Sequence, residues 1–236
     1  LDPFIEEHVK AMGIKCKGKE IIPACGELNP DIVAEALNGG RNANDIPPYS
    51  GTLPPRPPAL CKGCPHINVF NTLKKLDLNV NGDIGCYTLG VMPPYSAMHS
   101  QGCMGASIGM HLGFEKANPA LARSSVAVIG DSTFIHSGIT ALIDLVYNGG
   151  TGTVMVLDNR VTAMTGHQEN PATGLTLMGD PAPALDLEAL CRACGVKRVV
   201  VVDPADAEKL EAAVKEEVAA LEPSVIITRR KCILKK

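Results

Sequence analysis

Hydrophobic residues recur along most of the chain in two spacings, one typical of buried strands and one typical of amphipathic helices. Short runs of aliphatic residues predict strands at 78–84, 125–129, 153–157, 197–202 and 224–229. Apolar residues every three to four positions predict helices at 66–76, 102–117, 133–147, 186–194 and 204–221. Strands that alternate with helices are typical of an α/β fold. We therefore expect an open, mostly parallel sheet with helices on both faces and ligands at the carboxyl ends of its strands.

The first part of the chain has a different pattern and divides from the rest at a proline-rich segment. Residues 1–46 begin with Leu1 in a helical pattern, continue through a strand-like patch at 20–24, and then show a helix start at Asn29 with proline next. We interpret them as the end of a preceding domain. Six prolines between 47 and 58 predict an extended linker over 47–60. The α/β domain is then expected at 61–236.

Composition and charge narrow the classes of function. Lys and Arg number 22 against 25 Asp and Glu, a formal charge of -3, so there is no basic excess for a nucleic-acid backbone. No apolar run reaches the roughly 20 residues of a membrane span. We expect a cytoplasmic protein. Nine cysteines in a reducing compartment favour metal or redox chemistry over a disulfide framework.

Polar residues follow two strands that we expect to be neighbours in the sheet. Gly130, Asp131 and Ser132 end one strand, and Asn159 comes after Asp158 at the end of the next. Magnesium prefers oxygen ligands, and usually takes one or two from side chains and the others from phosphates and water. Asp131 and Asn159 can supply two, and the backbone carbonyl of Val161 can supply a third. The helix that begins near Thr133 directs free N–H groups at an anion. The sequence therefore predicts a magnesium and phosphate site.

Four cysteines form a second constellation. Cys61 and Cys64 are two residues apart in one loop, Cys86 follows a predicted strand, and Cys232 follows the last strand. Such a pair can bind an iron–sulfur cluster from one tight loop, and a structural zinc site is the alternative for the same pair.

The remaining cysteines, glycines and histidines have less specific interpretations. Cys191 and Cys194 lie in a predicted amphipathic helix, where packing is the expected role, and we treat Cys16, Cys25 and Cys103 as structural. Four glycines spaced along 102–117 indicate close approach of another backbone or of a ligand, or plain close packing (Gly102, Gly105, Gly109 and Gly113). His66 and His167 adjoin the predicted loops and are candidates for a substrate site.

The Gly-Asp-Ser and Asp-Asn pairs, with 25 residues between them, resemble the thiamine-diphosphate motif, a Gly-Asp-Gly followed by Asn-Asn. The chain departs from that pattern at Ser132 and Asp158, and it keeps the two positions that the resemblance implies as magnesium ligands, Asp131 and Asn159. A cofactor-binding set follows from the same resemblance: Gly85, Cys86, Gly130, Asp131, Ser132, Thr133, Asn159 and Val161.

Longer phrases resemble the 2-oxoacid:ferredoxin oxidoreductase family, and within it the large subunits of the indolepyruvate type: RPPALCKGCPH, DIGCYTLG, GCMGASIGMHLGFEKA and GDSTFIHSGITAL. The resemblance covers roughly 20–232. It implies oxidative decarboxylation of an aryl 2-oxoacid to its acyl-coenzyme A, with electrons passing to ferredoxin. It also implies thiamine diphosphate, Mg²⁺ and a [4Fe-4S] cluster held by Cys61, Cys64, Cys86 and Cys232.

The same resemblance implies partners beyond this chain. These are a smaller second subunit, a pyrimidine-binding domain from other sequence or another chain, and an oligomeric assembly, and we expect the chain alone to bind the cofactor weakly and to be inactive. Two alternatives stay open from the residues. One is a non-redox thiamine-diphosphate decarboxylase or synthase, which leaves the cysteines without a role. The other is a non-enzymatic zinc or iron–sulfur α/β module.

Overall fold

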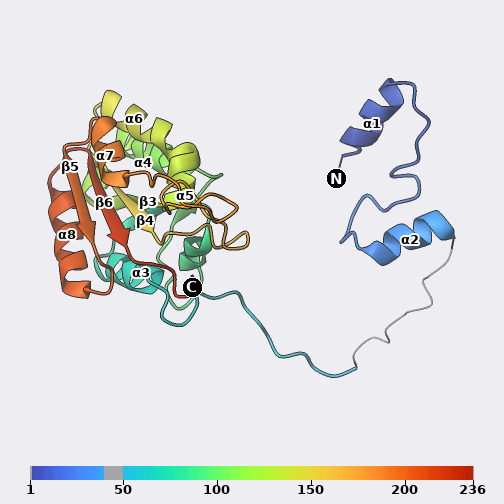
Figure 1. The fold of residues 1–236 in the computed structure, drawn as a ribbon, viewed down its shortest axis with the longest axis horizontal. Coiled ribbons are helices and arrows are strands. Elements are labelled where there is room, and N and C mark those ends of the chain that lie inside the picture. The colour runs from blue at the N-terminus through green and yellow to red at the C-terminus, as the bar shows by residue number, and fades with distance from the viewer. Residues whose placement is uncertain (1, 40–49, 236) are drawn as a thin grey trace. The chain divides into compact units, whose positions relative to one another are not determined.

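The computed structural model describes residues 2–39 and 50–235, and it divides the chain into two compact units, Leu1–Arg56 and Pro57–Lys236 (Figure 1). The division falls inside the proline-rich segment. Residues 50–60 contain neither helix nor strand, and 47–49 lie outside the described residues.

The first unit holds two helices, α1 (Phe4–Ala11) and α2 (Pro30–Asn38). The side chain of Asn29 caps α2 by accepting the N–H of Ile32 at 3.0 Å, as the Asn-Pro start predicts. The strand expected at 20–24 is wrong. The N–H groups of Ile21 and Ile22 both donate to the Gly18 carbonyl, so this backbone closes into a turn and does not enter a strand ladder.

The second unit is built on one sheet of six parallel strands in the order β2-β1-β3-β4-β6-β5. The strands are β1 (Asn79–Gly82), β2 (Ser100–Gln101), β3 (Ser125–Gly130), β4 (Thr153–Asp158), β5 (Arg198–Val202) and β6 (Ser224–Arg229). Every residue of β3 and β4 is buried, in agreement with the largely apolar sequences of both strands. The parallel sheet is confirmed. Only β2 was not expected.

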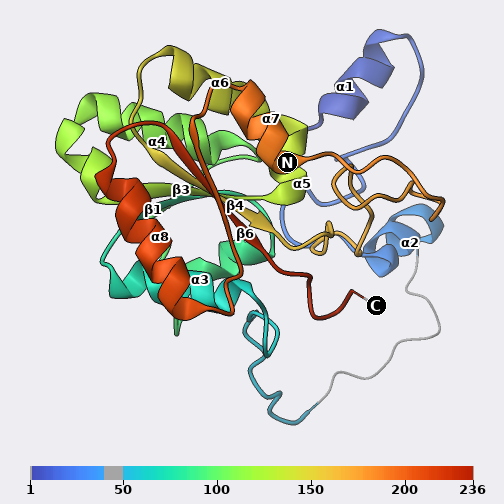
Figure 2. The same ribbon diagram turned by 60° about the vertical axis from the view of Figure 1, so that its left-hand side comes forward.

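Helices cover both faces of the sheet, as expected (Figure 2). Alternate residues of β3 enter different cores: Val126 and Val128 pack with the layer of α3 (His66–Lys75) and α8 (Ala207–Ala219). Ala127 and Ile129 pack with the layer of α4 (Ala106–Ala117), α6 (Ile139–Tyr147) and α7 (Leu187–Ala193). The sheet therefore has an apolar core on each of its two faces.

The structure departs from the expected helices in segments next to β1 and β3. The helix expected at 133–147 begins earlier, as α5 (Asp131–Thr133), and passes through a π-helical turn (Phe134–Gly138) into α6. A short 3₁₀ helix, Cys86–Val91, follows β1, and another, Pro119–Arg123, precedes β3. π-helical turns are frequent at functional sites.

The glycines expected along one helix divide into two groups. Gly102 and Gly105 precede α4, and Gly105 caps it with φ +88° where a Cβ would lie 2.5 Å from Ser137 Oγ, so glycine is required there. Gly109 and Gly113 lie within α4, and a Cβ at either would meet no atom within 4 Å. Among the described residues, therefore, no backbone makes the close approach to Gly109 or Gly113 that the sequence suggested.

Among residues 2–39 and 50–235, no helix has the length and apolar character needed to cross a membrane.

Candidate functional site

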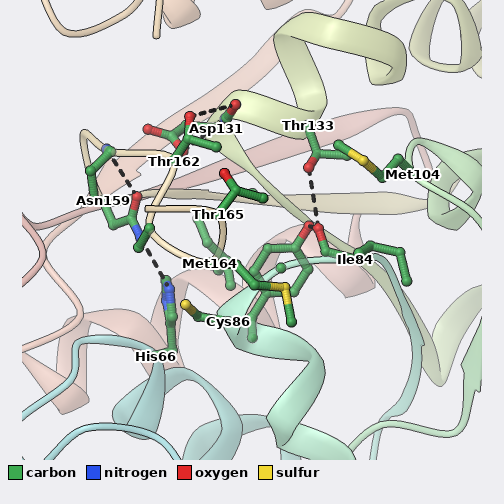
Figure 3. A pocket seen from close by; sticks show the side chains of 17 residues that line it. His66, Ile84, Cys86, Met104, Asp131, Thr133, Asn159, Thr162, Met164 and Thr165 are labelled. Carbon is green, nitrogen blue, oxygen red and sulfur yellow. Dashed lines mark hydrogen bonds between the residues drawn. The ribbon is translucent and has the colours of Figure 1, made fainter. Parts of the chain in front are cut away.

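The carboxyl ends of β3 and β4 place Asp131 beside the segment that starts at Asn159 (Figure 3). Asp131 is 2% exposed, and its carboxylate accepts three N–H groups. The backbone N–H of Ser132 donates to Oδ1 at 2.8 Å, and the backbone N–H of Arg160 donates to Oδ2 at 3.0 Å. The third donor is the side-chain amide of Asn170, at 3.3 Å. The two expected magnesium ligands therefore come from strand ends that share a direct hydrogen bond.

The Asn159 carboxamide is held at both of its polar atoms. Oδ1 accepts the backbone N–H of Val161 at 3.2 Å, and Nδ2 lies 3.4 Å from Nε2 of His66. Hydroxyl groups connect the neighbouring loops, since Thr162 donates to Ser132 Oγ at 2.9 Å and Thr133 donates to the Ile84 carbonyl at 3.2 Å. Ser132, one of the two departures from the thiamine-diphosphate motif, thus bonds across the site.

All eight residues expected to bind the cofactor line one cavity at this edge of the sheet: Gly85, Cys86, Gly130, Asp131, Ser132, Thr133, Asn159 and Val161. Other residues line the same cavity although no sequence pattern identified them as candidates, among them Tyr87, Met104, Thr162 and Met164. Figure 3 shows Met104 and Met164 in the wall of the same cavity as Asp131.

Tyr87 forms one wall and explains a glycine. Its hydroxyl donates to the Ile84 carbonyl at 2.8 Å, and a Cβ at Gly130 would lie 2.6 Å from the Tyr87 ring. Any larger residue at 130 would displace the ring. Burial raises the pKa of Tyr87, so its hydroxyl stays protonated.

The carboxyl group of Asp131 lies in an environment that disfavours its charge. Burial raises its pKa from the ordinary value of 3.8 to about 6. Its N–H donors oppose this rise, and the negative charge of Asp158 adds to it. No cationic side chain pairs with Asp131 among the described residues. A bound cation would supply the missing countercharge.

Asp158, the other departure from the motif, has two arginine partners. Its side chain is fully buried, with Arg229 Nε 2.8 Å from Oδ2 and Arg160 Nε 3.1 Å from Oδ1. The first contact is a hydrogen bond, whereas the second is an ion pair whose angles do not meet hydrogen-bond geometry. Arg160 takes the left-handed φ of +59°, and its guanidinium donates to the Ala172 carbonyl at 2.6 Å. Asp158 therefore helps to hold the residue whose backbone binds Asp131.

The four cysteines expected at a cluster line a second cavity, namely Cys61, Cys64, Cys86 and Cys232. Cys232 reaches it because its N–H donates to the Asn159 carbonyl at 3.0 Å, which lays the segment after β6 along the end of β4. Burial, together with the neighbouring thiols and against the effect of the His66 backbone, raises the pKa of Cys64 to about 11. Within residues 2–39 and 50–235, no group of three or more His, Cys, Asp or Glu is spaced to hold a metal ion.

The two cavities adjoin each other. His66, Cys86, Asn159 and Ala163 line both. His66 is 3% exposed, and burial lowers its pKa to about 4, so the imidazole is neutral and is not a general acid at physiological pH. The other candidate histidine, His167, is exposed and lines only the cysteine cavity.

Two further residues organise the site without having stood out in the sequence. Asn170 donates to Asp131 from a polar loop that has no periodic pattern. Asp83 is fully buried and accepts the N–H groups of Gly105 at 2.9 Å and Ser107 at 3.0 Å, so it caps α4 from the end of β1. Cys191, expected to serve in packing, lies in the core of the α4, α6 and α7 layer.

Comparisons with known proteins agree with this geometry. Residues 83–228 match the family described as "Thiamine pyrophosphate enzyme, C-terminal TPP binding domain". The chain is 37% identical to the indolepyruvate oxidoreductase subunit IorA of Methanothermobacter marburgensis, over 99% of this chain and 40% of that protein. It is 36% identical to IorA of Pyrococcus horikoshii, over 99% and 41%. The chain thus spans about 40% of the length of these curated relatives.

Solved structures of low sequence identity share the fold. The 2-oxoglutarate:ferredoxin oxidoreductase from Magnetococcus marinus superposes with a TM-score of 0.63 at 16% identity, over 75% of this chain and 65% of that one. The thiamine diphosphate-dependent 4-hydroxybenzoylformate decarboxylase of Rhodococcus jostii RHA1 gives 0.53 at 20% identity, over 90% and 42%.

We expect Asp158→Asn to lower the free energy of unfolding by about 3 kcal/mol, because it leaves two arginines beside a buried neutral amide. Urea unfolding measures this change. The matched control is Asp203→Asn, which weakens the half-exposed pair with Arg230 and should cost less than about 1 kcal/mol. Equal effects of the two substitutions would contradict the assigned role of Asp158.

Without Mg²⁺ or cofactor, wild-type stability should rise relative to Asp131→Ala as the pH falls from about 7 to about 4. The folded state binds a proton at Asp131 near pH 6 and the unfolded state only near 3.8, so acid favours the folded wild type. The gain approaches about 3 kcal/mol. Urea unfolding of both proteins across this pH range measures it. A difference that stays constant would show that the carboxyl group is not perturbed.

Proposed function

The chain belongs to the thiamine pyrophosphate enzymes, whose C-terminal TPP-binding domain it carries, and from this premise we propose that the cavity at Asp131 and Asn159 binds the diphosphate of thiamine diphosphate through Mg²⁺. The magnesium ligands are the Asp131 carboxylate, the Asn159 carboxamide oxygen and the Val161 carbonyl. Diphosphate oxygens and water complete the coordination.

The chemistry of the donors supports a hard dication. Asp131 is a buried carboxylate with N–H donors and no cationic side chain, and its raised pKa reports the missing countercharge. A divalent cation bound there would supply the missing positive charge and would attract the diphosphate to the same strand ends. A helix starts at Asp131, directly after Gly130, and its N-terminal end favours a negatively charged group in the adjoining cavity.

For the second cavity we propose a [4Fe-4S] cluster held by Cys61, Cys64, Cys86 and Cys232. Burial and the neighbouring thiols raise the pKa values of Cys64 and Cys86, so both are protonated as free thiols, whereas bound iron would deprotonate them. The four cysteines at one cavity match the four thiolates that such a cluster takes, which is what supports the cluster over the zinc alternative at Cys61 and Cys64.

We propose that the complete enzyme oxidatively decarboxylates aryl 2-oxoacids of the indolepyruvate type to acyl-coenzyme A, with ferredoxin as electron acceptor. When bound, thiamine diphosphate would supply a nucleophilic carbon for the keto group and, separately, a cationic ring that serves as the electron sink for decarboxylation. This chain binds and orients the diphosphate, and the wall that separates the two cavities keeps the cluster close to the cofactor. That shared wall is the observation that carries the proposal, since a non-redox decarboxylase needs no cluster beside its cofactor.

The remaining parts of the proposal lie outside this chain, which spans about 40% of its curated relatives. They are a pyrimidine-binding domain, a smaller second subunit and an oligomeric assembly. We propose the cytoplasm as the compartment, because nine free cysteines are best kept reduced there.

Calorimetric titration of the full-length enzyme with thiamine diphosphate should show binding that requires Mg²⁺ and that Asp131→Ala reduces at least about 100-fold, because the variant lacks a ligand to the metal. Asp203→Ala, at an exposed ion pair, is the control and should bind as the wild type does. Equal affinity with and without Asp131 would exclude this magnesium site.

Cys64→Ser should remove about four irons and four acid-labile sulfides from each anaerobically purified enzyme chain, together with the matching visible absorbance. Cys191→Ser is the control, since Cys191 is a buried thiol in the core that lines neither cavity. Zinc in place of iron would favour a structural metal site, and unchanged iron in Cys64→Ser would exclude the second cavity as the cluster site.

A further inference from the structure

His66 lies where the two cavities meet and lines both of them. It is the first residue of α3, two positions after Cys64, with Pro65 between them. Its buried imidazole lies 3.4 Å from Nδ2 of Asn159, across 93 positions of sequence. This contact is not needed to form α3 itself.

The contact with Asn159 selects one orientation of a carboxamide. An amide nitrogen can only donate, so Nε2 of His66 accepts from Nδ2 of Asn159. Oδ1 is then placed on the other side of the carboxamide, where it also accepts the Val161 N–H. Figure 3 shows the nitrogen of Asn159 facing His66 and the oxygen turned away from it.

Without the imidazole, the carboxamide loses one of the two partners that distinguish its nitrogen from its oxygen and keeps only the Val161 N–H at 3.2 Å. A half-turn about the side-chain bond would then exchange the two atoms and present an NH₂ group where a magnesium ligand is required. Partners of metal ligands typically contribute 10- to 100-fold to metal affinity through such orientation.

We propose that His66 is a positioning residue for the magnesium-bound diphosphate, which fixes the Asn159 carboxamide so that its oxygen and not its nitrogen is available to the metal. This inference rests on the proposed function. It assigns His66 no contact with the reacting atoms. It also makes the cysteine loop, through the residue that follows it, part of the support of the cofactor site.

The test measures Mg²⁺-dependent binding of thiamine diphosphate to the full-length enzyme by calorimetry, so that it does not depend on turnover. His66→Ala should raise the Mg²⁺ concentration at half-saturation about 10-fold or more. His66→Gln should regain most of the lost Mg²⁺ affinity, because the side-chain carbonyl of glutamine can accept from Asn159 Nδ2.

The matched control is His111→Ala: His111 is also a fully buried, neutral imidazole, but it bonds to Asn81 and lines neither cavity. It should lower stability and leave Mg²⁺ half-saturation unchanged.

A double-mutant cycle with Asn159→Ala identifies the route of the effect. If His66 acts through Asn159, then His66→Ala should have no further effect on Mg²⁺ half-saturation once Asn159 is alanine. Additive losses, or equal losses in His66→Ala and His111→Ala, would overturn the inference while leaving the magnesium site in place. Absence of Mg²⁺-dependent binding in the wild type would instead overturn the proposed function and this inference with it.

Discussion

The hydrogen bond from the backbone of Arg160 to the buried carboxylate of Asp131 is the interaction on which the rest of the site depends. It can form only because β3 and β4 are parallel neighbours in a register that pairs Gly130 with Leu157, so that both strands end at the same height. The side chains that follow then lie opposite one another. A shift of either strand by one residue would turn Asp131 to the other face of the sheet.

The buried carboxylates of Asp131 and Asp158 lie at the same edge of the sheet, and only one of them has cationic partners. Asp158 is matched by Arg160 and Arg229, whereas Asp131 has N–H donors alone. The arginine partners allow an aspartate where the thiamine-diphosphate motif has its first asparagine, and they also fix the backbone that binds Asp131. The chain thus keeps its uncompensated charge at one position, next to the cavity. A buried charge without a partner is costly, and such a group is retained where a ligand supplies the countercharge.

Sequence alone was sufficient for the elements whose burial is complete. The strands at 125–129 and 153–157 are correct to within a residue, because both faces of β3 and β4 lie against apolar layers and leave no polar interruption. Their adjacency brought Asp131 and Asn159 together as expected. β2 was missed because two residues carry no pattern, and the π-helical turn was missed because it keeps the apolar face of a helix. The strand at 20–24 was wrong because its backbone bonds are satisfied locally.

The supporting residues of the site were beyond the reach of sequence patterns because their partners are remote. Asn170 is 39 positions from Asp131, and His66 is 93 from Asn159. No helical or strand period relates such pairs, and only the folded loops bring them into contact. Such long-range contacts hold together segments that no strand pairing connects: the contact between His66 and Asn159 joins the start of α3 to the segment after β4.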